Sequence, residues 1–525
     1  MQFPARRKEI HYGERIVDCF IDRPANIDAM FRAAVASFPD ADALAAGEKR
    51  LTYRQLDGIV DAVAANLLDS GLRAGERVAL LLGNGLEFVF CLLAAARAGL
   101  VCVPMNIRQR RPETAFVLNQ CGAAALIYDA EHELQLPEGN EVPTLRHIYC
   151  VGQGAHPPFQ ALQKPAGKSA FADVPEEAVF CLLYTSGTTG QPKGAKLTHF
   201  STLHSVLHYQ HAFQLRAGDV AMLAVPASHV TGVVAIILTT IRVGGCTVML
   251  PVFKARSFLE IAARQKVSYT LIVPAMYNLC LLDPDFSTFD LSHWRVAGFG
   301  GAPMPQATIE KLAQVLPNLM LVNIYGSTET TSPVTLLPLG DIKHAPTSVG
   351  KVLPCADLII VDEQGREVAP GQSGEILIGG PMVVPGYWDN PAGDKSSFIN
   401  GYWISGDIGS KDAEGYVYVF DRKKDMINRG GFKVYCIEVE GILARHPCVI
   451  ETAVIGKPDP VLGERVHAFI VGRPASATEH DIKAFCAQHL SDYKVPDAVT
   501  FLDQPLPRNA AGKVLKTQLR ALLQA

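Results

Sequence analysis

One short loop of the chain gathers glycines, hydroxyl side chains and a lysine. Residues 184–194 read Tyr-Thr-Ser-Gly-Thr-Thr-Gly-Gln-Pro-Lys-Gly. The glycines permit backbone turns that other residues avoid, and the hydroxyl and backbone N–H groups can donate to an anion. Lys193 adds a positive charge, so the loop predicts a phosphate-binding site. It is not a Walker A loop, which needs Gly-Lys-Ser/Thr, because Gln191 and Pro192 separate Gly190 from the lysine.

A cluster of Gly, Ser and Thr can also be a flexible linker. Here the apolar run 179–183 precedes the loop and predicts a buried strand. Ordered structure is expected to resume at 195–199. A loop bounded by ordered segments and carrying one lysine is less typical of a linker, so we favour anion binding.

Other segments carry residues that could do chemistry, although each residue alone has an ordinary explanation. An isolated histidine such as His229 is more often part of a core, and a single carboxylate such as Glu329 more often lies on the surface. Most exposed lysines, Lys513 included, would have no specific role. Their context argues otherwise, since Glu329 follows the predicted strand 320–324 and open α/β sheets bind ligands at the carboxyl ends of strands.

The elements that must position these residues alternate between strand and helix. Residues 77–82 and 100–104 predict buried strands around a helix at 87–97 that ends at Gly99. The alternation returns further on and predicts parallel sheets covered by helices. Its later elements are 269–273, 295–299, 305–316 and 320–324.

The last part of the chain has a different pattern. Short strands with glycine turns at 357–380 predict a small β-rich subdomain. The charged run 421–425 follows a predicted strand and predicts a boundary, although such a run alone is usually a solvated turn. Beyond it we expect an α+β tail with a helix at 437–445 and another that begins at Thr478, capped by Asp481.

Composition excludes several classes of function. The 525 residues suffice for several domains, and a net charge of −4 does not predict a nucleic-acid partner. The 12 cysteines form no Cys-x-x-Cys pair, so we expect reduced, mostly buried thiols in a cytoplasmic protein. The apolar stretch 220–241 is interrupted by Pro226, Ser228 and His229, which predicts a buried strand and helix rather than a membrane span. The N-terminus lacks the apolar core expected of a signal peptide, and the last residues do not match a peroxisomal or prenylation signal.

The loop at 184–194 resembles the phosphate loop of the adenylate-forming enzymes: acyl- and aryl-CoA synthetases, peptide-synthetase adenylation domains and beetle luciferases. Further segments resemble the family's motifs in the same order, and they lie near His229, Gly300, Tyr325, Asp407, Arg422, Gly430 and Lys513. The resemblance implies an acid–CoA ligase that uses ATP, Mg²⁺ and coenzyme A. A carboxylic acid and ATP would give acyl-AMP and pyrophosphate, and CoA would then displace AMP.

The resemblance also implies a fold and a division into domains. We expect an α/β protein whose large N-terminal domain, residues 1–421, holds two α/β subdomains and the β-rich one. Residues 422–525 would form a small, mobile α+β lid that turns about a hinge at Lys424. A homodimer is left open.

The resemblance assigns roles to individual residues. Catalysis falls to Lys513, His229, Thr185 and Glu329, with Glu329 as the magnesium ligand and Lys513 between the substrate carboxylate and the α-phosphate. Tyr325 would stack on adenine, Asp407 would bind the ribose hydroxyls, and Gly430 and Gly431 would line the CoA tunnel. The nucleotide-binding residues are Thr185, Ser186, Gly187, Thr188, Thr189, Gly190, Lys193, Gly301, Ala302, Pro303, Tyr325, Gly326, Thr328, Asp407 and Arg422.

The expected acyl pocket is apolar. No Asp or Glu lies between Val220 and Thr240 to bind an α-ammonium group, which argues against an amino acid. No Lys or Arg lies in the pocket motifs, which disfavours dicarboxylates, so we expect an aromatic or a short- to medium-chain aliphatic acid. The expected lining residues are His229, Val233, Phe299, Gly300, Gly301, Ser332 and Val334.

Alternatives remain at this point. A stand-alone adenylation enzyme that loads a carrier protein would share the same adenylation residues. A luciferase-like oxygenase and a non-catalytic homologue are disfavoured, the latter because Lys513, Glu329 and Asp407 are all present. The chain also departs from the commonest family pattern, with Phe432 where many members have Glu and Cys436 where many have Pro.

Overall fold

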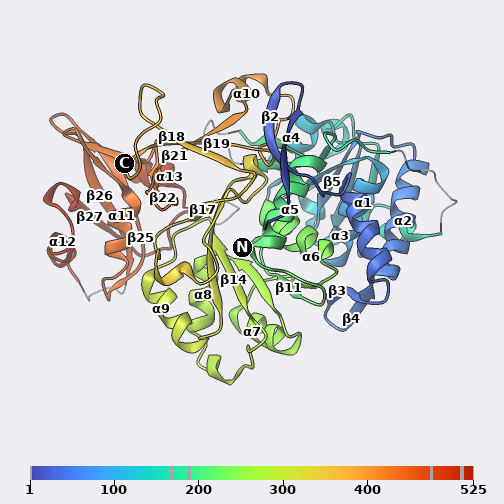
Figure 1. Cartoon of the computed structure of the whole chain (residues 1–525), viewed down its shortest axis with the longest axis horizontal. Helices are drawn as coiled ribbons and strands as arrows, with labels where there is room; N and C mark the ends of the chain where they lie inside the picture. Colours follow the sequence, from blue (N-terminus) through green and yellow to red (C-terminus); the bar gives the residue numbers. More distant parts are fainter. Residues whose placement is uncertain are drawn as a thin grey trace. The chain divides into compact units, whose positions relative to one another are not determined.

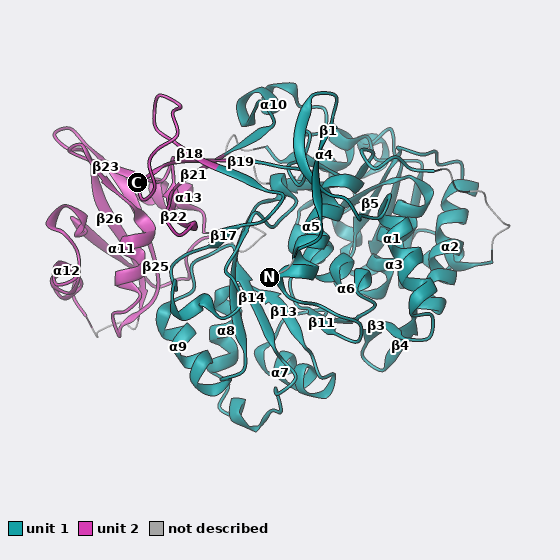
Figure 2. Cartoon of the chain, in the orientation of Figure 1, with its two compact units in different colours: residues 1–358, 378–404 teal, residues 359–377, 405–525 magenta. Residues whose placement is uncertain are grey.

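The structure, a computed structural model, describes residues 3–165, 171, 173–185, 191–472, 477–508 and 514–523. The chain forms two compact units (Figure 2). Unit 1 holds residues 1–358 and 378–404, and unit 2 holds residues 359–377 and 405–525. Unit 2 thus includes residues upstream of 422, and the predicted domain boundary at that position stays a prediction.

The first sheet of unit 1 contains the two strands that flank the predicted phosphate loop in the sequence. Five strands run parallel, and β10 pairs antiparallel with β9 across the loop. The spatial order is β10-β9-β6-β5-β7-β8. Apolar side chains fill the strands because helices cover the faces of a parallel sheet. The bounds are β5 Arg77–Leu81, β6 Val101–Pro104, β7 Ala125–Asp129, β8 His147–Val151, β9 Val179–Thr185 and β10 Lys193–Thr198.

The second sheet of unit 1 brings further predicted site residues to its strand ends. Strands β12, β11, β13, β14 and β15 lie parallel and side by side. Strand β3 extends them in parallel, whereas β4, β16 and β17 pair antiparallel at the two ends. The bounds are β3 Asp42–Ala46, β4 Lys49–Thr52, β11 Val220–Leu223, β12 Cys246–Met249, β13 Tyr269–Ile272, β14 Val296–Gly300, β15 Met320–Tyr325, β16 Thr335–Leu336 and β17 Gly350–Val352.

Helices of unit 1 pack on these sheets, and α1, α2 and α3 lie side by side (Figure 1). The buried Arg97 on α3 joins all three helices, since its guanidinium pairs with Asp28 on α1 and with Asp57 and Asp61 on α2 at 2.6–2.8 Å. The bounds are α1 Ile27–Ser37, α2 Tyr53–Asp69, α3 Leu86–Ala98, α4 Arg111–Cys121, α5 His199–Ala212, α6 Thr239–Arg242, α7 Ala255–Arg264, α8 Pro274–Leu281, α9 Gln306–Val315 and α10 Pro391–Ser397.

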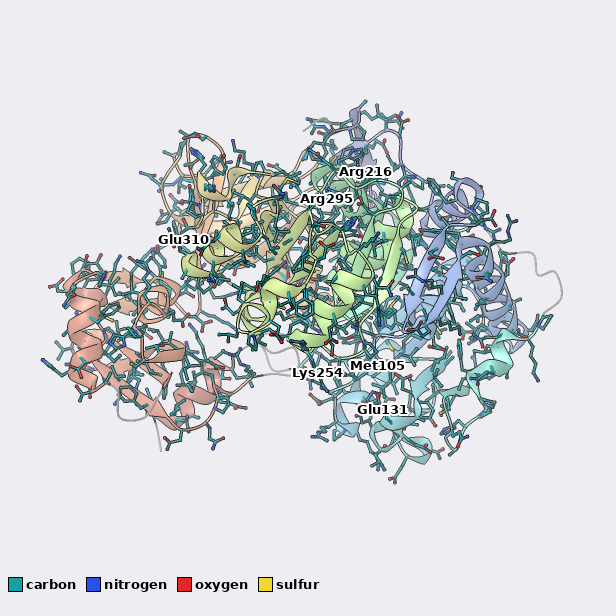
Figure 3. All side chains as sticks on the ribbon, turned by 90° about the horizontal axis from the view of Figure 1, so that it is seen from below. Met105, Glu131, Arg216, Lys254, Arg295 and Glu310 are labelled. Atoms are coloured by element: carbon teal, nitrogen blue, oxygen red, sulfur yellow. The ribbon has the colours of Figure 1, made fainter. Side chains whose placement is uncertain are left out.

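The apolar stretch 220–241 is a strand followed by helix, as predicted, and its helical part has an unexpected form. β11 leads into a π-helical segment, Thr231–Leu238, before α6. None of the described helices is long and apolar enough to cross a membrane. The turn before β11 is fixed by Asp219, which accepts from the guanidinium of Arg295 at 2.6 Å and from the backbone N–H of Arg216 at 2.8 Å. Figure 3 labels Arg216 and Arg295.

Unit 1 also contains an N-terminal hairpin and the short strand β20. The hairpin consists of β1, Arg6–His11, and β2, Arg15–Phe20, in antiparallel register. Strand β20, Phe398–Ile399, pairs with the start of β21, Tyr402–Lys411. All twelve cysteines of the chain are free and buried, in line with the prediction of reduced thiols.

Unit 2 contains the β-rich segment and the α+β tail. β25 and β26 form a long antiparallel pair, flanked by β27 and by the hairpin β23–β24. Thr478 caps α12 with Asp481 as predicted. The boundary between the units passes through β18, β19 and β21. The remaining bounds are β18 Asp357–Val361, β19 Gly374–Gly379, β22 Tyr416–Arg422, β23 Ile427–Arg429, β24 Phe432–Val434, β25 Val449–Asp459, β26 Gly463–Gly472, β27 Ala498–Leu502, α11 Cys436–Leu443, α12 Glu479–Ala487 and α13 Lys516–Leu522.

Helix α5 follows β10 directly and is almost wholly buried. It begins after Thr198, whose hydroxyl accepts the N–H of Ser201 at 3.0 Å. His199 accepts the N–H of Ile27 through Nδ1 at 3.1 Å. His204 accepts the N–H of Phe20 through Nε2 at 3.3 Å. Burial lowers the pKa of His199 to about 4 and that of His204 to about 3, so both rings are neutral at pH 7.

We therefore expect mild acid to destabilise unit 1. In the unfolded chain these histidines protonate near pH 6.5, whereas in the folded protein they stay neutral to about pH 4 and 3. The stability is complete above pH 6.5 and falls as the pH drops below it, by up to about 1.4 kcal/mol per pH unit for each histidine. Urea unfolding between pH 7.5 and 5 measures this slope. His199→Gln keeps an acceptor but cannot protonate, so its slope should be shallower; a slope equal to wild type would contradict the assignment.

Candidate active site

Glu329 lies in a short helical turn, Thr328–Thr330, just beyond the end of β15. The N–H of Ser327 donates to the Thr330 hydroxyl at 2.9 Å, and that hydroxyl donates back to the Ser327 carbonyl at 3.1 Å. The next residue, Thr331, adopts the left-handed conformation at φ 50°, which ends the turn. These local bonds fix the backbone from which the Glu329 side chain projects.

The carboxylate of Glu329 is buried, with the residue 7% exposed, and three hydroxyl groups donate to it. Ser327 Oγ lies 2.6 Å from one oxygen, while Tyr387 OH at 2.9 Å and Thr185 Oγ1 at 3.4 Å share the other. None of the ion pairs found among the described residues involves this carboxylate. A buried carboxylate with hydroxyl partners and no cation fits a hard divalent ion such as Mg²⁺, which prefers oxygen ligands.

The predicted phosphate loop begins and ends beside this carboxylate. Thr185, the last residue of β9, pairs across the ladder with Lys193, the first residue of β10. The Lys193 ammonium lies 5.0 Å from the centroid of the Tyr387 ring, a cation–π contact. The structure therefore places Thr185 against Glu329 and Lys193 opposite Thr185, and the roles of these residues stay predictions. The loop residues Ser186, Gly187, Thr188, Thr189 and Gly190 lie outside the described residues.

The other predicted nucleotide residues of unit 1 also lie at strand ends. Tyr325 is the last residue of β15, with Gly326 and Thr328 directly after it. The segment that follows β14 carries Gly301, Ala302 and Pro303, all exposed. Carboxyl ends of parallel strands are where open α/β sheets bind ligands, so these residues are placed where a nucleotide site is expected.

His229 stands just before the π-helical segment. Its N–H donates to the Pro226 carbonyl at 3.1 Å, and its own carbonyl accepts the N–H of Val233 at 3.0 Å. Burial lowers the pKa of His229, and the positive charge of Arg108 lowers it further. The imidazole is therefore neutral at pH 7 and keeps a lone pair for a hydrogen bond.

The predicted acyl-pocket residues are mostly buried. Val233, Phe299 and Val334 are at most 1% exposed, and Ser332 Oγ bonds the Tyr209 hydroxyl at 2.8 Å. Gly300 ends β14, and a Cβ atom there would lie 2.5 Å from the carbonyl oxygen of Ile324. This glycine is therefore required by the close approach of β15.

Asp407 and Arg422 lie in unit 2, and the structure pairs them directly. They are register partners on β21 and β22, and Arg422 Nε lies 2.7 Å from Asp407 Oδ1. Asp407 is buried, and its N–H donates to Ser405 Oγ at 3.0 Å. The two predicted nucleotide contacts thus form one charge-paired unit.

The predicted CoA and hinge residues also lie in unit 2. Gly430 and Gly431 form the two-residue turn between β23 and β24, with φ of 59° and 90°. Two successive positive φ values are typical of the turn type that glycine favours in tight hairpins. Lys424 is exposed in the turn after β22, whereas Asp421 in the same charged run is buried and accepts the N–H groups of Arg422 and Cys436. The run is therefore only in part a solvated turn.

Lys513 lies outside the described residues, and α13 begins three positions later in the sequence. Lys516 on that helix pairs with Glu440 at 2.9 Å. Arg520 pairs with Asp425, beside the predicted hinge, at 3.0 Å.

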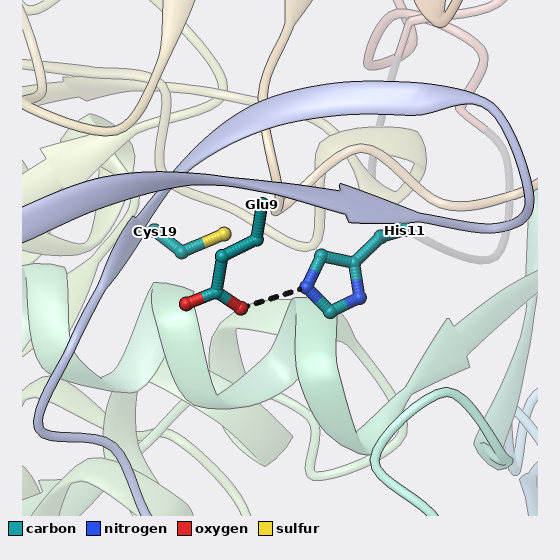
Figure 4. Close-up of side chains that lie close together, drawn as sticks. All are labelled: Glu9, His11 and Cys19. Carbon is teal, nitrogen blue, oxygen red and sulfur yellow. Dashed lines mark hydrogen bonds and ion pairs between the residues drawn. The ribbon is translucent and has the colours of Figure 1, made fainter.

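A second group of possible ligands lies on the N-terminal hairpin, where Glu9, His11 and Cys19 approach one another (Figure 4). Arg23 donates to both carboxylate oxygens of Glu9, at 2.7 and 3.1 Å. His11 contacts Glu9 through Nε2 and Glu177 through Nδ1. Burial raises the pKa of the Cys19 thiol to about 12, so it is not a thiolate at neutral pH. Glu9 and His11 therefore already have hydrogen-bond partners in the protein. We interpret the group as a set of contacts that holds the hairpin in place rather than as a metal site.

Sequence reasoning missed Tyr387 and Ser327. Ser327 stood within a recognised motif, and its position two residues before Glu329 could have suggested the contact. Tyr387 is 58 residues away from Glu329 in the chain, and no sequence pattern around it predicts the contact.

Comparison with known proteins identifies the family. The family model described as AMP-binding enzyme matches residues 31–388, and the model described as AMP-binding enzyme C-terminal domain matches residues 438–513. The chain belongs to the AMP-binding enzyme family. Similar members cover nearly its whole length, and several of them are named as CoA ligases.

Three members illustrate the range. The chain is 34% identical over 483 residues to the long-chain-fatty-acid–CoA ligase FadD13 of Mycobacterium tuberculosis, covering 90% of this chain and 93% of that one. It is 33% identical to a feruloyl-CoA synthase of an Amycolatopsis species, with 92% and 96% covered. It is 31% identical to the fatty acid–[acyl-carrier-protein] ligase ScoC of Streptomyces coeruleorubidus, with 92% and 93% covered.

Solved structures of the family agree with the fold. The anthranilate CoA ligase AuaEII in complex with anthranoyl-AMP matches with a TM-score of 0.88 at 27% identity, covering 95% of this chain and 97% of that one. The o-succinylbenzoate CoA synthetase MenE of Bacillus subtilis, in complex with ATP and magnesium, matches with a TM-score of 0.83 at 28% identity, covering 94% and 99%.

These findings confirm the main predictions. The fold is α/β with a large N-terminal and a small C-terminal domain. The chain is an AMP-forming acid–CoA ligase that uses ATP, Mg²⁺ and coenzyme A. The roles of the individual site residues stay predictions.

The contact at Gly300 yields a test of the strand that ends in the expected pocket. Gly300→Ala should force Ile324 away from β14 and lower the free energy of unfolding by about 1–3 kcal/mol. Activity should fall alike for all acids, because the strand moves rather than the pocket volume. Gly58→Ala is the control, since a Cβ on that α2 residue meets no atom within 4 Å and should stabilise the protein by about 0.5–1 kcal/mol. Thermal melts and pyrophosphate release measure both; an unperturbed Gly300→Ala enzyme would refute the contact.

Proposed function

We propose that this ligase activates an aromatic or a short- to medium-chain aliphatic acid as its acyl-adenylate, with Glu329 as the magnesium ligand, and then transfers the acyl group to CoA. The observation that carries the proposal is the Glu329 carboxylate, buried under three hydroxyl donors with Lys193 held nearby over Tyr387.

Each of these groups would have a role in the first half-reaction, the formation of the acyl-adenylate. Thr185 and Lys193 would bind the phosphates that leave as pyrophosphate. Mg²⁺ on Glu329 would neutralise charge on the triphosphate oxygens. Lys513 would stabilise the charge that builds up at the α-phosphate as the substrate carboxylate attacks it.

The remaining predicted residues would serve the nucleotide and the thiol. Asp407, which pairs with Arg422, would bind the ribose hydroxyls through its carboxylate. Neutral His229 would border the reacting carboxylate, to which its ring N–H would donate, and the entry of the thiol. The glycine turn at 430–431 would pass close to the thin pantetheine arm of CoA.

The acid class follows from the expected pocket. Val233, Phe299 and Val334 offer apolar, fully buried side chains and no charge for a second carboxylate or an ammonium group. By their names, the similar proteins act on both aromatic and long-chain acids, so similarity alone does not choose between them. ATP–pyrophosphate exchange over a panel of benzoates, cinnamates and C2 to C16 fatty acids is the deciding experiment. Exchange confined to C14–C16 acids would contradict the proposed class.

A second candidate is loading of a carrier protein, favoured by the similarity to ScoC. Both candidates share the adenylation step and differ in the acceptor. Mass spectrometry of reactions that contain either free CoA or a phosphopantetheinylated carrier protein separates them. Free acyl-CoA formed at a rate comparable to adenylation supports the first candidate.

Location and assembly also remain proposals. A cytoplasmic location agrees with twelve free, buried thiols. A homodimer is proposed from the family resemblance alone, and light scattering at micromolar concentration tests it.

Lys513→Ala should separate the two half-reactions. Loss of the charge that Lys513 is proposed to bring to the α-phosphate should slow adenylation by on the order of 10²–10³-fold or more. Acyl transfer to CoA from synthetic acyl-adenylate should change far less, and this step serves as the internal control. Equal losses in both steps would show that Lys513 is not specific to adenylation.

Lys424→Pro tests the predicted hinge. Proline fixes φ at this exposed turn position and should hinder rotation of the C-terminal domain. Pyrophosphate exchange should survive while acyl-CoA formation falls severely. Lys424→Ala removes the same charge but leaves the torsion free, so it should retain both steps. A proline variant with a normal thioester step would show that the pivot lies elsewhere.

A further inference from the structure

Residues 382–388 form a segment, here called the strap, that joins the turn of Glu329 to the strand of Lys193. At one end the N–H of Val384 donates to the Glu329 carbonyl at 3.0 Å. The Thr331 hydroxyl donates to the Met382 carbonyl at 2.8 Å. The strap is therefore bonded on both sides of the turn that presents the carboxylate.

At its other end the strap pairs with β10. The N–H of Trp388 donates to the Gly194 carbonyl at 2.7 Å, and the N–H of Lys196 donates to the Gly386 carbonyl at 3.1 Å. These two bonds bracket Tyr387, which pairs antiparallel with Ala195. The backbone of Tyr387 is thus held next to the strand that begins at Lys193.

From this position the Tyr387 side chain contacts both the Glu329 carboxylate and the Lys193 ammonium. Its hydroxyl donates to Glu329 Oε1 at 2.9 Å, and its ring lies 5.0 Å from the Lys193 ammonium. The residue is 4% exposed. Burial, and next the Glu329 charge, raise the pKa of Tyr387, so the hydroxyl stays protonated and can only donate to the carboxylate.

An arginine from the N-terminal hairpin supports the strap from outside. Arg15 on β2 donates to the carbonyls of Val383, Val384 and Pro385 at 3.3, 3.1 and 3.4 Å. The backbone of Val383 and Val384 is buried, and the guanidinium supplies donors for three successive carbonyls. None of the contacts of Arg15 among the described residues reaches Glu329 or Lys193, so we infer that Arg15 acts on them through the strap.

We propose that Tyr387 is a positioning residue for the magnesium site. It holds the Glu329 carboxylate in one orientation and fixes the Lys193 ammonium beside it, and Arg15 maintains Tyr387 through the strap. Partners that orient a ligating carboxylate typically contribute 10- to 100-fold to metal affinity or activity. This inference rests on the proposed role of Glu329 as the magnesium ligand.

Tyr387→Phe is the direct test, because it removes only the hydroxyl and keeps the ring under Lys193. We expect the Mg²⁺ concentration for half-maximal pyrophosphate exchange to rise about 10- to 100-fold, with a smaller change at saturating Mg²⁺. Electron paramagnetic resonance of Mn²⁺ bound with a non-hydrolysable ATP analogue should show the same loss of affinity without turnover. The control is Tyr53→Phe, which removes a buried hydroxyl that donates to the Gly245 carbonyl at 2.8 Å. It should leave both metal measurements unchanged.

Arg15→Met extends the test to the strap. We expect a smaller shift in the same direction, and the shift should vanish when Tyr387→Phe is already present, because both act through one hydroxyl. Additive shifts would overturn the role assigned to Arg15.

Two outcomes separate this inference from the function on which it rests. If Glu329→Gln weakens Mn²⁺ binding while Tyr387→Phe matches wild type, Tyr387 has no positioning role and the proposed function stands. If Glu329→Gln also matches wild type, the magnesium role of Glu329 falls, and the inference falls with it.

Discussion

The candidate site of unit 1 is built around one buried carboxylate, that of Glu329. An ionised Glu329 side chain loses much of its hydration, which is costly unless hydrogen bonds or a cation replace the water. Three hydroxyl groups supply the hydrogen bonds, and no lysine or arginine of the described chain supplies the cation. The carboxylate is therefore compensated by polar donors alone, which leaves its charge available to a metal ion.

Several segments that are distant in the chain meet at this carboxylate. The end of β9 contributes Thr185, the turn after β15 contributes Ser327 and Glu329, and the strap contributes Tyr387. Two different sheets thus deliver residues to one place, each from the carboxyl end of a parallel strand. The N-terminal hairpin does not contribute a residue to this carboxylate directly; its Arg15 contacts the strap that carries Tyr387. In unit 2 two predicted site residues, Asp407 and Arg422, also contact each other directly, because they are register partners on the paired strands β21 and β22.

Much of this could be predicted where the signal is local. The apolar run before the phosphate loop did become β9, the alternation of strand and helix around residues 77–104 is present, and Thr478 does cap α12 with Asp481. These features depend on near neighbours in the chain, so periodicity and turn chemistry reveal them.

Contacts that depend on how distant segments pack together could not be predicted from the sequence. Tyr387 meets Glu329 only because the strap pairs with β10, and no pattern near residue 387 encodes that pairing. Asp421 is buried although it belongs to a charged run, since the N–H of Cys436 requires an acceptor there. The π-helical form of 231–238 and the close approach of Ile324 to Gly300 likewise depend on the tertiary fold. The acid itself is not encoded in any local motif.

The central claim is that Glu329 holds the divalent cation that accompanies ATP. The most direct measurement is anomalous diffraction from crystals grown with a non-hydrolysable ATP analogue and Mn²⁺ in place of Mg²⁺. The account predicts a metal peak within coordination distance of a Glu329 oxygen, about 2.1 Å, with Tyr387 still donating to that carboxylate. A peak bound to the nucleotide elsewhere, with Glu329 in contact only with its three hydroxyl donors, would contradict it.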